Sequence, residues 1–197
     1  MLKDHAVEQG LDNFHNEFRN ARKAAERACN ALPAGAEQDS ARASLNSYGA
    51  ERTVNGVTVG QGKLANGVAA EARTAYFAYD EKAGTFIAQV EVVLNEGGSG
   101  NLSVDVAHEG RHVADAQGFA GALTQDVAMN GAQSTAAIMG EFNRTRYERE
   151  VRAYTVSSSI AQGLGLPNLS VRILKSGTAA GDKLTAQPCA PEQWTRT

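Results

Sequence analysis

The stretch of sequence that decides the fold is VDVAHEGRHVADAQGF, residues Val104–Phe119. It contains no proline, is rich in alanine and carries Asp105 near its start, so it predicts a helix from Val104 to about Leu123. Within it, His108-Glu109-Gly110-Arg111-His112 forms an HExxH pattern. Residues four apart on a helix share one face. Two imidazole rings placed in this way can bind one Zn²⁺ at about 2.0–2.1 Å from each nitrogen.

A glutamate follows the first histidine of this pattern. The carboxylate of Glu109 is placed to reach a metal-bound water rather than the metal, so it can take a proton and later return it. The chain has only four histidines, and two of them belong to the pattern. An expected strand, Thr85–Leu94, and a glycine-rich loop precede it. Together these features favour a metal site over a polar surface helix with two chance histidines.

A catalytic zinc ion needs a third protein ligand besides water. A third histidine six residues after His112 is excluded, because Gly118 stands there. The remaining histidines, His5 and His15, lie on the expected N-terminal helix and are weak candidates. The third ligand is therefore expected to be a glutamate further along the chain.

The segment RYEREVRAY, residues 146–154, offers two such glutamates. Two residues on a helix correspond to about 200° of rotation, so only one of Glu148 and Glu150 can face the metal. Ala153 lies on the face of Glu150 and is small enough to let two helices pack closely. We choose Glu150, with Glu148 as the alternative, Glu141 as a more distant one, and a solvated Glu/Arg helix face as the non-functional interpretation.

Other side chains near the motif have open roles. Asp115, three residues after His112, could orient a ligand histidine through its other ring nitrogen or could be structural. Tyr147 and Tyr154 could donate a hydrogen bond to a developing oxyanion or could simply pack.

The rest of the chain predicts an α+β fold, with helices, a small antiparallel sheet and further helices in that order. The expected elements are helices at Leu2–Ala31, Glu37–Tyr48 and within Gln133–Ala161, a strand at Thr53–Val59, a hairpin of Thr74–Tyr79 and Thr85–Leu94, and a short strand at Leu169–Leu174. We expect one domain over residues 1–197: N-terminal helices in 1–50, the sheet region in 53–100, active-site helices in 101–162 and a C-terminal tail in 163–197.

The composition excludes several classes of protein. The 197 residues include 19 Lys+Arg and 22 Asp+Glu, a net charge of −3, which argues against nucleic acid as the main partner. No apolar run approaches the roughly 18–20 residues that span a bilayer. Residues Met1–Gly10 are polar, so no secretory signal peptide is expected. The two cysteines, Cys29 and Cys189, could form a disulfide or remain ordinary thiols.

VDVAHEGRHVADAQGF together with YEREVRAYTVSS resembles the zincin-like metallopeptidase domains at the C-termini of bacterial polymorphic toxins, such as Rhs-repeat and related secreted effectors. In that family an AHEGxHVAD-type helix is followed about 30–40 residues later by a Glu-x-x-Ala-Tyr helix. The specific part of the resemblance covers Val104–Ser159, and the segment Asn55–Val57 is a weaker match.

The resemblance implies a zincin-like fold with a gluzincin-type site. His108, His112 and Glu150 would bind Zn²⁺, and Glu109 would be the general base. It also implies a domain excised from a larger effector chain, delivered into a target cell by secretion machinery without a signal peptide. A cognate immunity protein would be expected in the producing cell. The periplasm and the cytoplasm of the target both remain open as the site of action.

The sequence thus predicts a zinc-dependent metallopeptidase acting on a protein or peptide substrate. The strand Thr85–Leu94 is a candidate edge strand to which an extended peptide could add. Two alternatives remain: a zinc amidase or hydrolase acting on cell-wall peptides, and a binding module without catalysis whose toxicity comes from occupying its target.

Overall fold

The computed structural model describes residues 2–50, 55–96, 100–131, 142 and 145–173, and their side chains from residue 13 onward. The elements are α1 (Leu2–Ala31), α2 (Ala36–Asn46), β1 (Val57–Gly62), β2 (Ala70–Asp80), β3 (Thr85–Asn95), α3 (Leu102–Asn130) and α5 (Arg146–Gly163). Their order confirms the predicted α+β class. No helix within the described ranges is both long enough and apolar enough to cross a bilayer.

The helices begin and end close to where local signals place them. The bounds of α1 agree with the prediction, and α2 ends two residues earlier than expected. The motif helix α3 is longer than predicted at both ends, because the Asn101 side chain caps its N-terminus and no breaker interrupts it before Gly131. Of the helical region expected over Gln133–Ala161, α5 accounts for the second half, and most of 132–144 lies outside the described residues.

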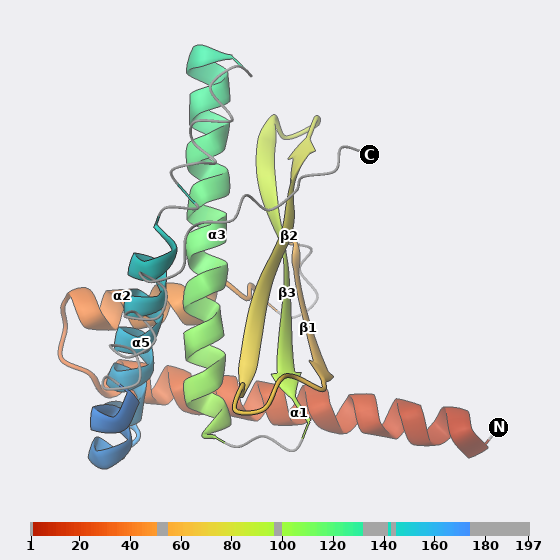
Figure 1. The fold of residues 1–197 in the computed structure, drawn as a ribbon, viewed down its shortest axis with the longest axis vertical. Helices are drawn as coiled ribbons and strands as arrows, with labels where there is room; N and C mark the ends of the chain where they lie inside the picture. Colours follow the sequence, from red (N-terminus) through yellow and green to blue (C-terminus); the bar gives the residue numbers. More distant parts are fainter. Residues whose placement is uncertain (1, 51–54, 97–99, 132–141, 143–144, 174–197) are drawn as a thin grey trace.

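The expectation of an antiparallel sheet is wrong for one of its two strand pairs. The three strands have the order β1-β3-β2, and β2 pairs with β3 in antiparallel register as a hairpin. In contrast, β1 pairs with β3 in parallel. The connection from β1 to β2 carries the chain across the position that β3 later fills, so β3 enters between its two neighbours (Figure 1). The sheet is therefore mixed.

This order also corrects the expectation that residues Thr85–Leu94 form an edge strand. They belong to β3, which has partners on both sides and no free backbone edge. The edge beside α3 belongs to β2 instead. The N–H of Asn95 donates to Ala69 O, which marks a hydrogen-bonded pair, so in the alternating ladder the N–H of Ala72 points away from β3.

Two further local predictions are corrected. The strand expected over Thr53–Val59 begins only at Val57, because Gly56 has φ +78° and its carbonyl accepts from Val90 N. The short strand expected at Leu169–Leu174 is wrong, since residues 167–173 are helical. A proline suits the first position of a helix, and Ser170 N donates to Leu166 O with helical spacing.

Helix α3 is the central element of the fold. Helices α2 and α5 pack on one side of it and the sheet on the other, while α1 crosses near one end (Figure 1). Alternate residues of β3, among them Val90 and Val92, are buried on the face that packs against α3. Val106 and Val113 of α3 are fully buried. The motif helix is thus held from several directions before any ligand is considered.

The third residue of the HExxH motif is a glycine because α2 approaches α3 there. A Cβ on Gly110 would lie 2.4 Å from Ser44 O and 2.9 Å from Tyr48 Cε2. The hydroxyl of Ser47 donates to Gly110 O at 2.9 Å, and the hydroxyl of Tyr48 donates to Val106 O at 2.7 Å. These contacts fix the position of α3 along its own axis.

We predict that Gly110→Ala destabilises the protein by about 1–3 kcal/mol, because the added methyl must displace α2 backbone. Gly118→Ala is the matched control on the same helix, since a Cβ there meets nothing within 4 Å. It should stabilise the protein by up to about 1 kcal/mol through helix propensity. Urea unfolding of the two variants measures both effects. Equal stability of Gly110→Ala and the wild type would contradict the described packing.

Candidate metal centre

The two motif histidines lie on one face of α3, as the i, i+4 spacing requires. The ring centroids of His108 and His112 are 5.0 Å apart and the rings meet edge to face. Both side chains are 17% exposed, so they are largely shielded but reachable from solvent. The pair therefore presents two imidazole nitrogens to one point beside the helix.

Helix α5 brings Glu150 to the same point. Its Oε1 lies 3.6 Å from His112 Nε2, and its Oε2 lies 3.9 Å from His108 Nε2. One donor atom from each residue lies within 4.8 Å of the others, so the three form a group that could hold a metal ion. Tetrahedral zinc needs ligand atoms roughly 3.3 Å apart, a spacing that small side-chain movements would reach. Glu148, the alternative ligand, is exposed and lies outside this group.

The pKa shifts of His108, His112 and Glu150 favour binding of a cation, because few protons have to be lost first. Burial and the nearby charge of His112 lower the pKa of His108 to about 3, despite the opposing charge of Glu150. Burial alone would lower the pKa of His112, but Glu150, Glu109 and Asp115 outweigh it and raise the pKa. The pKa of Glu150 is lowered, because His112 and His108 outweigh the effect of its burial. Only His112 must lose a proton before the group can bind a metal.

A serine that sequence reasoning missed orients the first histidine. The hydroxyl of Ser157 donates to Ala153 O at 3.0 Å, so its oxygen is left to accept a hydrogen bond from His108 Nδ1, also at 3.0 Å. A proton on Nδ1 leaves the lone pair of Nε2 facing Glu150. Ser157 follows Glu150 by seven residues on α5, which is two helical turns, so helix periodicity is the signal that could have found it.

The glutamate of the motif is buried beside the group without belonging to it. Glu109 is 5% exposed, and the outward-facing N–H of Ala72 on strand β2 is directed at its carboxylate closely enough to lower its pKa. Burial raises the pKa of Glu109 to about 7, against the lowering effects of His112 and the Ala72 N–H. A carboxyl with a pKa near neutrality can both accept and return a proton. The structure thus places a group suited to general acid–base chemistry next to the candidate metal ligands.

Asp115 does not take the orienting role that was one of its two expected options. Its carboxylate accepts from Arg111 on its own helix and, at 3.1 Å, from Arg152 on α5. Its side chain is only 6% exposed, so these two guanidinium groups neutralise a buried charge. Asp115 therefore ties α3 to α5, which supports the structural interpretation.

The other residues suggested by the sequence differ in whether they lie near this group. The ring of Tyr154 packs edge-on against His108 with centroids 4.8 Å apart, and burial, Glu150 and Glu109 raise its pKa. Tyr147 is 37% exposed, and His15 is exposed on α1. Tyr154 is thus the tyrosine close to the group. Glu141 lies outside the described residues, as does the side chain of His5.

The disulfide question is not tested, because Cys189 lies outside the described residues. Cys29 is buried on α1, and its thiol lies 3.5 Å from Gln38 O. Burial raises the pKa of the Cys29 thiol, so the described surroundings do not activate it as a nucleophile.

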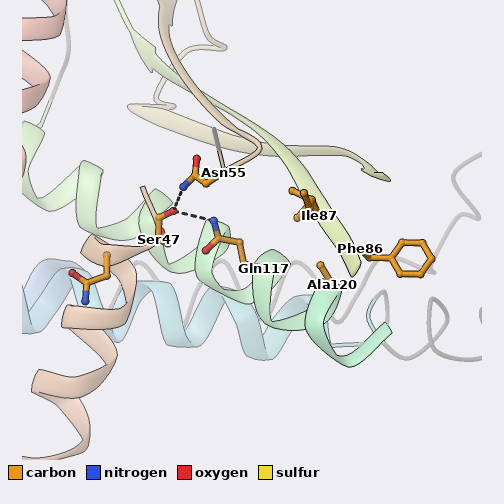
Figure 2. Close-up of a pocket in the computed structure, with 8 residues that line it drawn as sticks. Ser47, Asn55, Phe86, Ile87, Gln117 and Ala120 are labelled. Atoms are coloured by element: carbon orange, nitrogen blue, oxygen red, sulfur yellow. Dashed lines mark hydrogen bonds between the residues drawn. The ribbon is translucent and has the colours of Figure 1, made fainter. Parts of the chain in front are cut away.

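A separate hollow of about 370 Å³ opens on a different face of α3. Its polar part is the carbonyl of Ser47, which accepts from Asn55 Nδ2 at 3.0 Å and from Gln117 Nε2 at 2.9 Å (Figure 2). Gln117 follows His112 by five residues and therefore points about 140° away from it. The lining residues are Asn46, Ser47, Asn55, Phe86, Ile87, Ala88, Gln117 and Ala120. None of them is ionisable, so this hollow offers no chemistry comparable with that of the metal-binding group.

Comparison of the chain with protein-family models, curated proteins and solved structures finds no match. The function of the site must therefore be inferred from its own residues.

We predict that Ser157→Ala weakens zinc affinity about 10- to 100-fold, because the orientation and tautomer of His108 are no longer fixed. Ser159→Ala is the matched control: Ser159 is equally buried on α5, but it bonds Thr155 O and Glu37 rather than a histidine. A zinc titration against a competing chelator gives the affinity, and thermal unfolding checks both folds. Equal zinc affinity of the two variants would show that the Ser157 contact does not act on the metal.

We predict that zinc binding displaces a proton from His112. Its pKa is raised, so below that pKa the folded protein holds a proton that zinc must replace. Affinity should fall about tenfold for each pH unit below it and level off above it. His108 adds nothing in this range, because its pKa is about 3. Calorimetry in buffers of different ionisation enthalpy should detect proton release at pH 6, and Glu109→Gln removes the part that comes from the neighbouring carboxyl, whose pKa is about 7, to leave about one proton from His112. No proton release there would contradict the assignment.

Proposed function

We propose that this chain is a zinc-dependent metallopeptidase that hydrolyses peptide bonds with an activated water. One observation carries the proposal: His108, His112 and Glu150 converge on one point, and Glu109 lies buried beside it without joining the group. Three protein donors with a further position left open are typical of catalytic zinc, whereas structural zinc sites are closed by four.

The two imidazoles and one carboxylate of the candidate site are a ligand set that zinc accepts. Two imidazoles and one carboxylate also suit non-haem iron, so the donors alone do not choose the metal. Glu109 favours hydrolysis, because a buried carboxyl with a pKa of about 7 is suited to move protons on and off water. Zinc, when bound, would supply Lewis acidity, which polarises a carbonyl oxygen and lowers the pKa of water.

The residues of the chain divide the remaining tasks. Glu109 takes a proton from water and returns it to the departing amine, and the nearby Ala72 N–H favours the ionised form of its carboxyl. Tyr154 is the nearby hydroxyl that could donate to a developing oxyanion. Burial of the group on α3 and α5 limits access of bulk water, which strengthens the electrostatic contribution of each of these side chains.

An extended substrate would lie along β2 rather than along β3, which has no free edge. The alternating ladder leaves the N–H groups of Ala70 and Thr74 facing outward on either side of Ala72. A register shift between Thr74 and Tyr76 ends this regular edge close to the site. A peptide strand could pair with these groups and bring one of its bonds next to Glu109.

We further propose that the chain acts as the toxic domain of a secreted bacterial effector. This part rests on the resemblance of Val104–Ser159 to polymorphic toxin domains. It carries with it a parent effector chain, a secretion machine and a cognate immunity protein as partners. Identification of the substrate would distinguish the periplasm from the cytoplasm of a target cell as the compartment of action.

We predict about one equivalent of zinc per chain in the purified protein by elemental analysis. His112→Ala should abolish zinc binding and Glu150→Gln should weaken it. Glu109→Gln should retain zinc but lose about 10²- to 10⁴-fold in kcat on a protein substrate such as casein, because only proton transfer is removed. Glu148→Gln is the matched control, since that residue is exposed on the same helix and lies outside the group.

The outcomes separate the competing functions. Iron in place of zinc, or no bound metal after equilibration with excess zinc, would overturn the zinc peptidase. Digestion of purified peptidoglycan but not casein would favour the cell-wall amidase. Growth inhibition on expression that survives Glu109→Gln would favour a binding module without catalysis.

A further inference from the structure

A second aspartate on α3 lies beside the candidate site and has no assigned role. Asp105 precedes His108 by three residues and Glu109 by four, so it lies one turn earlier on the same side of the helix. Its charge acts on Glu109, whose pKa it helps to raise. The aspartate is therefore close enough to the proposed reaction to meet the same substrate.

Among the described residues, no hydrogen-bond donor or cationic side chain pairs with the Asp105 carboxylate, and neither of its oxygens is sealed from solvent. Burial raises the pKa of Asp105 to about 6. Helix capping does not explain it, because Asn101 already accepts from Ser103 N at the start of α3. Asp105 lies in the first turn of α3, where a negative charge favours the helix dipole, but the described residues supply no donor or cation that pairs with its carboxylate.

The space next to this carboxylate is open because the neighbouring loop residue is a glycine. A Cβ on Gly100 would lie 2.9 Å from Asp105 Oδ2 and 3.3 Å from Oδ1. Any other residue at this exposed position would fill the space beside the carboxylate. The described surroundings therefore leave room for a group from outside the protein to reach it.

We propose that Asp105 is a specificity-determining residue that binds the positively charged side chain of a substrate lysine or arginine next to the bond being cleaved. The inference rests on the proposed peptidase function. A cation would supply the donors that the described residues lack, and a charge-assisted hydrogen bond to a shielded carboxylate is stronger than one in bulk water. An acidic substrate side chain would instead meet Asp105 and Glu109, and two like charges at close range disfavour binding.

Binding to an inactive enzyme tests the subsite without catalysis. The Glu109→Gln variant of the 197-residue chain, loaded with zinc, is titrated with N-acetylated fluorescent peptides that differ only at one position: lysine, arginine, norleucine or glutamate. Lysine and arginine peptides should bind about 10- to 100-fold more tightly than the norleucine peptide. Asp105→Asn should abolish that difference and leave the norleucine peptide unaffected. Asp105→Glu should restore part of it.

Asp126→Asn is the matched control, because it removes the same charge from α3 beyond the site, where Asp126 accepts from Asn130. It should preserve the preference for lysine. Peptides with a free rather than acetylated N-terminus test the other source of a cation, the α-ammonium group. Tight binding that needs a free N-terminus and not a lysine would overturn the side-chain assignment.

Cleavage by the active chain separates this inference from the proposed function. The same peptides should show the same preference in kcat/KM, and Asp105→Lys should shift it toward glutamate. If the wild type cleaves lysine and norleucine peptides equally, the subsite is wrong and the peptidase stands. If no peptide is bound or cleaved by zinc-loaded protein, both are wrong. Thermal unfolding checks that each variant is folded. If Asp105→Asn does not fold, the comparison is made with Asp105→Glu instead.

Discussion

The packing of α5 against α3 is the contact on which the candidate site depends. Two of the three candidate metal ligands come from α3 and the third from α5. The same helix pair carries the His108–Ser157 hydrogen bond, which lies two turns along α5 from Glu150. Sliding one helix by a turn, about 5.4 Å, would break both contacts together. Arg152 and Asp115 add a third contact across the pair, so the register is fixed by polar groups as well as by packing.

Without a metal, the group is held by its own charges. His112 and Glu150 each shift the pKa of the other toward the charged form, whereas His108 stays neutral against Ser157. A cation would replace the proton of His112 and use the same carboxylate. The folded chain therefore has the site largely formed in advance, which lowers the reorganisation needed on binding. The buried helices around it supply the stability that this arrangement of shielded charges lacks.

Local features of the sequence are predictable because local physics produces them. The bounds of α1 follow from Pro33 and from its apolar spacing, and the β2–β3 hairpin follows from its turn residues. The HExxH pattern places its two histidines by helix geometry alone. Choosing Glu150 over Glu148 needed only the rotation per residue and the small Ala153, which is fully buried. Each of these inferences uses residues within a few turns of one another.

The features that were wrong or missed depend on contacts between distant segments. The parallel pairing of β1 with β3 is set by how the chain crosses the sheet, which strand patterns do not encode. Ser157 gains its role only once α5 lies against His108, 49 residues earlier in the chain. Asp115 was a plausible hydrogen-bond partner for a histidine, but its carboxylate accepts from Arg111 and Arg152 instead. The role of such a residue depends on contacts with residues far away in the sequence. A single sequence gives the identity of each residue but not these contacts.

The contrast between Asp105 and Asp115 shows how the fold treats carboxylates on one helix. Both are shielded aspartates of α3, ten residues apart, and they flank the HExxH motif. Asp115 receives two guanidinium groups, one of them from α5. Asp105 receives none from the described residues, and burial holds its pKa near 6. Leaving a charge unpaired works against folding, and such departures from local optimisation concentrate at functional sites. The unpaired carboxylate is the one that lies a turn from His108, on the side of the helix where the proposed substrate would bind.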